Sequence, residues 1–139
     1  MFLTRLIYVS TLSESCDSEA LHDILKTSRD HNEKTHLTGL LSHNQYYFLQ
    51  CLEGSREAVN DTYGHIVNDS RHSKVTILDY REIDCRDFGD WSMGNVPQSK
   101  LTALLNIQFS GSDQFLPYTL SAESAYLMML ELKKNLPSE

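Results

Sequence analysis

The sequence predicts an α+β domain of the ferredoxin-like class, with a βαββαβ sheet that carries both helices on one face. Short runs of β-branched and aromatic residues indicate strands. Two amphipathic segments that begin at capping residues indicate helices. These elements alternate as strand, helix, strand, strand, helix and strand, which is the split βαβ arrangement. A chain of 139 residues fits one such domain.

The first helix and the first three strands are predicted in the N-terminal half of the chain. The stretch "RLIYVS" gives a strand over Phe2–Val9. A helix begins at the capping residues Asp17 and Ser18. Two further strands, Leu37–Ser42 and Tyr46–Glu53, are joined by "SHNQ", which is short enough for a hairpin loop.

The second half of the chain completes the fold and adds a helical tail. Ser55 can cap a second helix, and a strand follows over Val75–Ile83. The segment "FGDWSMGNV" predicts a short fifth strand beyond it. Two more helical patterns, Ser99–Gln108 and Ser121–Leu136, end the chain. We therefore divide it into a domain over residues 1–97 and a C-terminal helical extension over residues 98–139.

Composition and charge exclude several classes of protein. The net charge of −7 argues against a nucleic-acid partner, which requires a basic surface to neutralise phosphates. No apolar run is long enough for a membrane span or a signal peptide, so we expect a cytoplasmic protein without a membrane partner. The three cysteines are widely spaced and are interpreted as reduced thiols, and the six histidines show no zinc spacing.

A polar set is predicted inside an apolar slot between the two helices and the sheet. The inward stripe of the first helix changes from apolar to polar towards its C-terminus, and so does that of the second helix. Alternation along the strands turns Tyr8 and Gln50 to the same side of the sheet. The polar set comprises Tyr8, Ser28, Asn32, Gln50 and Asp69, with Arg71 and His72 at the mouth of the slot.

Such a slot suits a flat heterocycle. Its faces would pack between apolar side chains, here Ile24, Leu41, Phe48 and Ile66. The primary amides of Asn32 and Gln50 could meet a ring edge of carbonyls and nitrogens, because each amide both donates and accepts. Arg71 could meet a phosphate group.

Five stretches, "RLIYVS", "SRDHNEKTHLTGLL", "FLQCLEGS", "DSRHSKV" and "FGDWSMG", resemble the BLUF family, bacterial blue-light sensors that use FAD. The resemblance covers about residues 2–97, with every motif in the expected order, and the chain looks like a short, stand-alone member. Residues 98–139 carry no such resemblance.

The resemblance implies a flavin between the two helices: FAD, with FMN or riboflavin as possible replacements. Tyr8 matches the tyrosine that gives an electron and then a proton to the excited flavin, and Gln50 the glutamine between that tyrosine and the ring. Trp91 and Met93 match a pair on the fifth strand that carries the signal outward. The implied cofactor contacts are Ile24, Ser28, His31, Asn32, Leu41, Phe48, Gln50, Ile66, Asp69, Arg71 and His72.

The implied function is light-gated signalling without enzymatic activity. Rearrangement of the hydrogen bonds of Gln50 would change the binding of an unidentified protein partner or the state of a homo-oligomer. A flavin-dependent oxidoreductase is the alternative, although no glycine-rich dinucleotide motif is present. A cofactor-free interaction module is a third possibility. Colour separates them: a yellow protein that shifts to the red in blue light, a yellow protein bleached by NADH, or a colourless protein.

The tail is predicted to pack on the sheet face that the first two helices leave bare. Its helices display more apolar side chains, among them Leu127, Met128 and Met129, than a solvated appendage carries. By alternation Leu3, Ile7, Leu49 and Cys51 point to that bare face.

Overall fold

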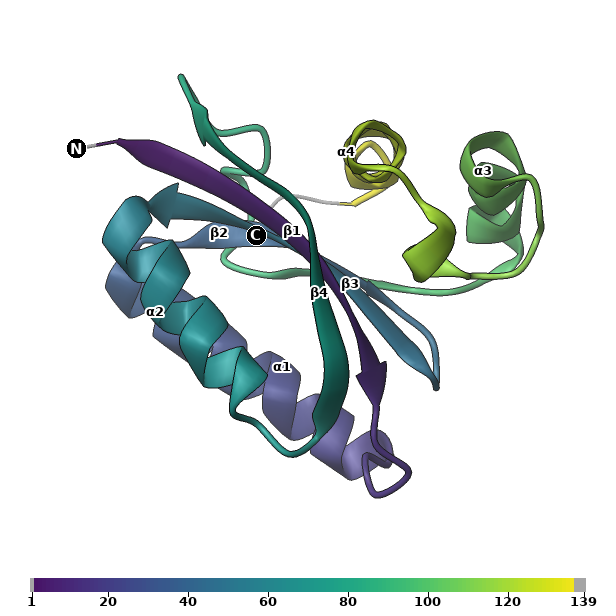
Figure 1. The fold of residues 1–139 in the computed structure, drawn as a ribbon, viewed down its shortest axis with the longest axis horizontal. Helices are drawn as coiled ribbons and strands as arrows, with labels where there is room; N and C mark the ends of the chain where they lie inside the picture. The colour runs from purple at the N-terminus through teal and green to yellow at the C-terminus, as the bar shows by residue number, and fades with distance from the viewer. Residues whose placement is uncertain (1, 137–139) are drawn as a thin grey trace.

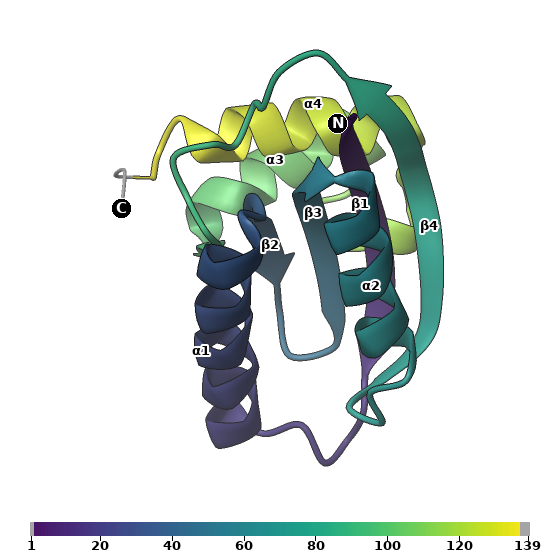
Figure 2. The same ribbon diagram turned by 90° about the vertical axis from the view of Figure 1, so that its left-hand side faces the viewer.

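The computed structural model describes residues 2–136 and places one five-stranded sheet between two layers of helices (Figure 1). Helices α1 and α2 cover one face, and α3 and α4 lie over the other (Figures 1 and 2). The elements in chain order are β1 (Leu3–Leu12), α1 (Ser18–Thr35), β2 (Thr38–His43), β3 (Tyr47–Ser55), α2 (Arg56–Val67), β4 (His72–Ile83), β5 (Gly94–Pro97), α3 (Lys100–Ser110), a 3-10 turn (Pro117–Thr119) and α4 (Ala122–Lys133).

Local capping explains where the helices begin and end. The Asp17 side chain accepts a hydrogen bond from the Ala20 amide at 2.9 Å and starts α1, as the sequence predicts. Helix α1 ends at His36, whose left-handed backbone (φ 57°) returns its N–H to the carbonyl of Asn32. The Ser55 hydroxyl accepts from Ala58 and starts α2 in the same way.

The strand order β4-β1-β3-β2-β5 confirms the ferredoxin-like class. Strand β1 runs antiparallel to both β3 and β4, and this register sets Tyr8 directly opposite Gln50. Strand β5 is shorter than the predicted segment and pairs in parallel with β2. Trp91 and Met93 therefore precede β5 instead of lying in it.

Side-chain alternation gives the sheet a separate apolar core on each face. Leu6 and Tyr8 pack with α1 and α2, whereas Ile7 and Val9 pack towards the tail. Residues of the tail-side core from α4 are Ala125, Met128, Met129 and Leu132. The prediction that the tail covers the second face is thus confirmed. The division at residue 97 remains a prediction, and residues 137–139 of the extension lie outside the described part.

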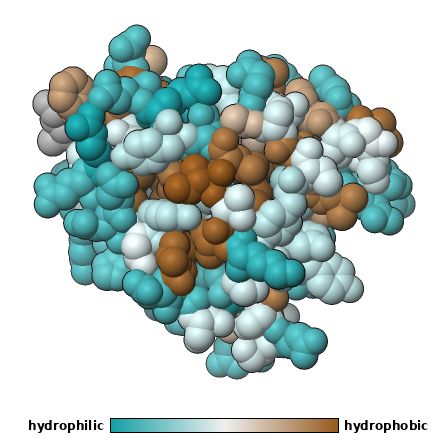
Figure 3. Space-filling view, viewed as in Figure 1, coloured by the Kyte–Doolittle hydropathy of each residue, from teal (hydrophilic) through white to brown (hydrophobic). Residues whose placement is uncertain are grey.

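Strand β4 forms one edge of the sheet and is partly open to solvent. Ile77 on this strand is 46% exposed. Figure 3, which has the same view as Figure 1, shows apolar side chains at the centre of the molecular surface with polar ones around them. Within residues 2–136, no helix has both the length and the apolar character needed to cross a membrane.

Candidate functional site

Tyr8 and Gln50 form the centre of the candidate site, on neighbouring strands under α1 and α2. The Tyr8 hydroxyl donates a hydrogen bond to Oε1 of Gln50, and both side chains are buried. The Nε2 of Gln50 points the other way and donates to Sδ of Met93 at 3.3 Å. Both ends of the amide therefore have a partner, which is why a glutamine is tolerated within the apolar strand β3.

A cavity of about 280 Å³ opens beside this pair, between the two helices and the sheet. All eleven residues that the sequence assigns to a cofactor line it, together with Tyr8. The walls include Ile24 from α1 and Ile66 from α2, with Leu41 and Phe48 from the sheet. Segments far apart in the sequence thus converge as predicted, although their roles as cofactor contacts remain predictions.

Four lining residues were missed by the sequence reasoning: Thr27, Leu52, Thr62 and His65. Leu52 could have been found, because it lies two residues after Gln50 on the same face of β3. Thr62 is buried and lines the cavity, whereas the neighbouring Tyr63 is half-buried and packs against the cavity-side core. Helix α2 thus presents Thr62 as well as Ile66 to the cavity.

Asn32 connects the cavity to the segment before β5. Its side chain is 1% exposed, and its Nδ2 donates to the carbonyl of Ser92 at 2.7 Å. Nearby, Nε of Arg29 donates to the carbonyl of Met93 at 3.1 Å. His31, one residue before Asn32, lies 3.0 Å from the Thr62 hydroxyl on the opposite helix. Helix α1 thus holds the backbone on which Met93 is presented to Gln50.

At the mouth of the cavity, the positive charge of Arg71, which the sequence suggests for a phosphate, is already paired with carboxylates. Arg71 makes a paired contact with Asp69, with Nε–Oδ1 at 3.0 Å and Nη2–Oδ2 at 2.7 Å, and its Nη1 lies 3.4 Å from Asp23. This hydrogen bonding by Arg71 lowers the pKa of Asp69, so the carboxylate stays charged and offsets the guanidinium. His72 contacts the Ser10 hydroxyl at 3.0 Å, and burial lowers its pKa.

Burial also determines the chemical state of Tyr8. It raises the pKa of the phenol, and the nearby Tyr63 and Asp69 raise it further. The phenol therefore keeps its proton at neutral pH and serves as the donor to Gln50. Tyr63 lies against it, with ring centroids 6.0 Å apart in an edge-to-face arrangement.

Trp91 and Met93, the two predicted signalling residues, lie on different sides of the sheet. Met93 is fully buried in the core with Tyr8, next to Gln50. Trp91 is 5% exposed and belongs to the tail-side core with Met128 and Met129. Trp91 and Met93, which both lie between β4 and β5, therefore pack on opposite faces of the sheet.

Among residues 2–136, no group of three or more His, Cys, Asp or Glu side chains is placed to hold a metal ion. The comparisons with known proteins point to a flavin instead. A family model described as sensors of blue light using FAD matches residues 3–94.

Curated relatives are larger than this chain. Over 107 residues, 76% of this chain, it is 29% identical to photoactivated adenylate cyclase subunit beta of Euglena gracilis, and it spans 12% of that protein. Over 91 residues, 66% of this chain, it is 31% identical to the blue light- and temperature-regulated antirepressor BluF of Escherichia coli (strain K12), and it spans 23% of that protein.

Two solved structures are similar to the chain over most of its length. The photo-activated state of BlsA superposes with a TM-score of 0.88 at 28% identity, covering 99% of this chain and 98% of that one. The dark state of BlrB, described as a BLUF protein, superposes with a TM-score of 0.70 at 33% identity over 74% of this chain and 78% of that one.

Proposed function

The chain belongs to the BLUF family, the blue-light photoreceptors that use FAD, and we propose that Tyr8 and Gln50 form its photochemical pair. The observation that carries this proposal is the buried hydrogen bond from the Tyr8 hydroxyl to Oε1 of Gln50 at the edge of the cavity. Signalling, and not catalysis of a chemical reaction, would be the output.

The residues around the cavity fit a flavin. Apolar side chains from both helices and the sheet form its walls, which suits the two faces of a flat ring system. The amides of Gln50 and Asn32 lie at the cavity and can donate or accept, which suits a ring edge that carries carbonyls and nitrogens. We propose that residues 1–97 hold FAD in this way, and that FMN or riboflavin can replace it because most contacts would be made to the ring.

Bound flavin would supply the absorption of blue light and a strongly oxidising excited state. Tyr8 would lose an electron, after which its phenol becomes a strong acid. The proton would then leave towards Gln50, because Oε1 of that amide already accepts the hydrogen bond. An amide can accept on oxygen and donate from nitrogen, so rotation or tautomerisation of Gln50 would exchange the groups that face the cavity.

The same change would reach Met93. In the structure Sδ of Met93 accepts from Nε2 of Gln50. A rotated amide would present its oxygen to that sulfur and remove the hydrogen bond. We propose that the segment between β4 and β5 then shifts and alters the binding of a separate protein partner or of another copy of the chain. A local hydrogen-bond change that biases two states is a general form of protein switch.

Replacement of Tyr8 by phenylalanine tests the proposal. Tyr8→Phe should keep the protein yellow, because the aromatic ring still fills its place, and should abolish the red-shifted product, because phenylalanine has no proton to give. Absorption spectra before and after blue illumination measure both effects. Tyr63→Phe is the matched control and should retain the shift, since its ring remains beside Tyr8. A normal red shift in Tyr8→Phe would refute the assignment, and bleaching by NADH would support an oxidoreductase.

A further inference from the structure

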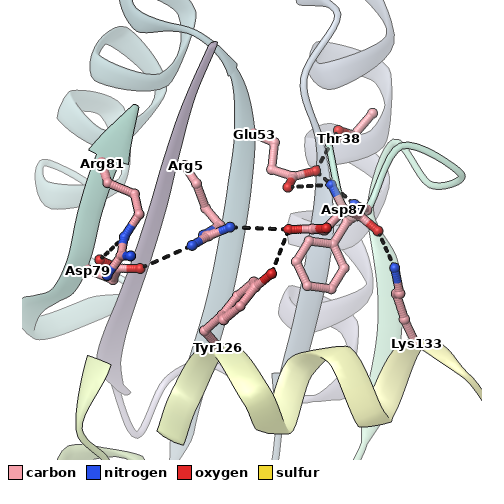
Figure 4. A network of polar contacts seen from close by, with 9 residues as sticks. Arg5, Thr38, Glu53, Asp79, Arg81, Asp87, Tyr126 and Lys133 are labelled. Atoms are coloured by element: carbon pink, nitrogen blue, oxygen red, sulfur yellow. Dashed lines mark hydrogen bonds and ion pairs between the residues drawn. The ribbon is translucent and has the colours of Figure 1, made fainter. Parts of the chain in front are cut away.

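A buried polar cluster lies on the face of the sheet opposite the cavity, under α4 (Figure 4). At its centre is Arg5 of β1, which is 4% exposed. Its Nη1 lies 3.2 Å from Oδ2 of Asp87, and its Nη2 lies 3.6 Å from Oδ2 of Asp79 on β4. A single guanidinium therefore serves two carboxylates from different parts of the chain.

Asp87 is also the residue through which α4 is hydrogen-bonded to the segment before β5. The Tyr126 hydroxyl donates to Oδ2 of Asp87 at 2.8 Å, and Nζ of Lys133 donates to its carbonyl at 2.7 Å. These two residues are seven positions apart and share one face of α4. The Tyr126 ring also lies over the guanidinium of Arg5, with 3.9 Å from Cζ to the ring centroid. Loss of the contact between Arg5 and Asp87 would thus weaken the hold on α4.

The backbone of the same segment is fixed to strand β3 on this same face of the sheet. The buried Glu53 of β3 accepts from the amides of Asp87 at 2.9 Å and Phe88 at 2.8 Å. At the other end of the segment, Met93 receives the hydrogen bond from Gln50. Residues 87–93 therefore connect the Gln50 amide to the residue that α4 holds.

Two atoms in the cluster lack a hydrogen-bond partner within the described part of the chain, and they are complementary. They are Nε of Arg5, a donor, and Oδ2 of Asp79, an acceptor, and both are buried. The distance of 3.6 Å between Arg5 and Asp79 is an ion pair but too long for a hydrogen bond. A shift of Arg5 towards Asp79 would let Oδ2 accept a hydrogen bond from the guanidinium. A second arrangement of Arg5 is therefore available to compensate for loss of Asp87, which matters because an unpaired buried charge is costly.

We propose that Arg5 is a two-position switch between Asp87 and Asp79, and that its transfer to Asp79 releases α4. In the dark position, Arg5 joins Asp87 and Asp79, and Tyr126 is held. After the change at Gln50, movement of residues 87–93 draws Asp87 away, and Arg5 closes on Asp79. This inference rests on the proposed function of Gln50 as the source of the movement.

Two isosteric substitutions have different expected effects on α4. Asp87→Asn removes the charge that holds Arg5 in the dark position, so the amides of α4 should exchange hydrogen about tenfold faster in darkness, with little further effect of light. Asp79→Asn removes the charge of the second position, so α4 should exchange no faster than in the unsubstituted protein and should lose its light response. Hydrogen–deuterium exchange of residues 122–133 in darkness and under blue light measures both.

Tyr118→Phe is a matched control within the tail. It removes a hydroxyl that contacts Thr11 and the Lys74 carbonyl, outside the Arg5 cluster, and should leave the light response of α4 unchanged. Faster exchange in both Asp variants would show that the cluster is only structural and would overturn the switch. So would an α4 that exchanges equally in light and darkness while the absorption still shifts. Absence of the shift itself would refute the photochemical proposal instead, and the two Asp variants compared in darkness would still test the switch.

Discussion

At the scale of single residues, the side-chain amide of Gln50 has one hydrogen-bond partner for its oxygen and another for its nitrogen. It accepts from Tyr8 through Oε1 and donates to Met93 through Nε2. Because burial keeps Tyr8 protonated, its hydroxyl can donate to Oε1 of Gln50, and this contact favours the present orientation of the amide. Loss of the Tyr8 proton would remove this donor, so the other orientation of the amide would then be favoured.

Substitution of Gln50 by leucine should lock the site in one spectral form. Leucine fills a similar volume but can neither accept from Tyr8 nor donate to Met93. The protein should still bind flavin and be yellow, with no red shift under blue light in absorption spectra. A photocycle of unreduced amplitude in Gln50→Leu would exclude the glutamine as the switch.

At the mouth of the cavity, substitutions of Arg71 and Asp69 should have opposite effects on the affinity for flavins that carry phosphate. Arg71→Ala should weaken the binding of FAD and FMN about tenfold more than that of riboflavin, because it removes a charge-assisted contact to phosphate and leaves Asp69 unneutralised. Asp69→Asn should strengthen the binding of FMN relative to that of riboflavin, since the positive charge of Arg71 is then no longer neutralised by Asp69. Fluorescence titration with the three flavins measures the ratios, and equal effects on all three would remove Arg71 from the phosphate role.

At the scale of elements, the features that depend on neighbouring residues could be predicted from the sequence. Asp17 and Ser55 start their helices through contacts three residues away, and such contacts are visible in the chain itself. Strand alternation likewise placed Tyr8 and Gln50 on one face. The burial of Thr62 on α2 could not be predicted in this way, because it depends on packing against α1 and the sheet.

The contact between β2 and β3 gives a test at this scale. A Cβ at Gly39 would collide with the backbone carbonyl of Cys51 on β3, whereas one at the exposed Gly64 of α2 would meet nothing within 4 Å. Gly39→Ala should therefore destabilise the fold by about 1–3 kcal/mol, since the strand must move. Gly64→Ala should stabilise it by about 1 kcal/mol, because alanine is the better helix former. Urea unfolding of both variants measures this, and a neutral Gly39→Ala would argue against the close approach of these strands.

At the scale of the whole molecule, one sheet serves two cores, and β1 and β3 contribute to both. Tyr8 and Gln50 face the cavity, while their neighbours Ile7, Leu49 and Cys51 face the tail. Along β1 and β3, each residue of the candidate site is thus directly followed or preceded by a residue that packs against the tail. The sequence predicted the cavity residues well because family motifs carry them. It did not predict the Arg5 cluster, because Asp79, Asp87 and Tyr126 are brought to Arg5 only by the fold.

Removal of the tail tests whether the second face carries the output. Truncation after Gln98 should leave flavin binding and the red shift largely intact, since the cavity is lined entirely by residues before that point. It should abolish any light-dependent change in partner binding or oligomeric state, because α4 would be the responding element. The truncated chain should also be less soluble, since it exposes Ile7, Leu49 and Cys51, which are fully buried in the intact protein. Size-exclusion chromatography of both chains in light and in darkness measures these effects, and an unchanged light response after truncation would place the output surface outside the tail.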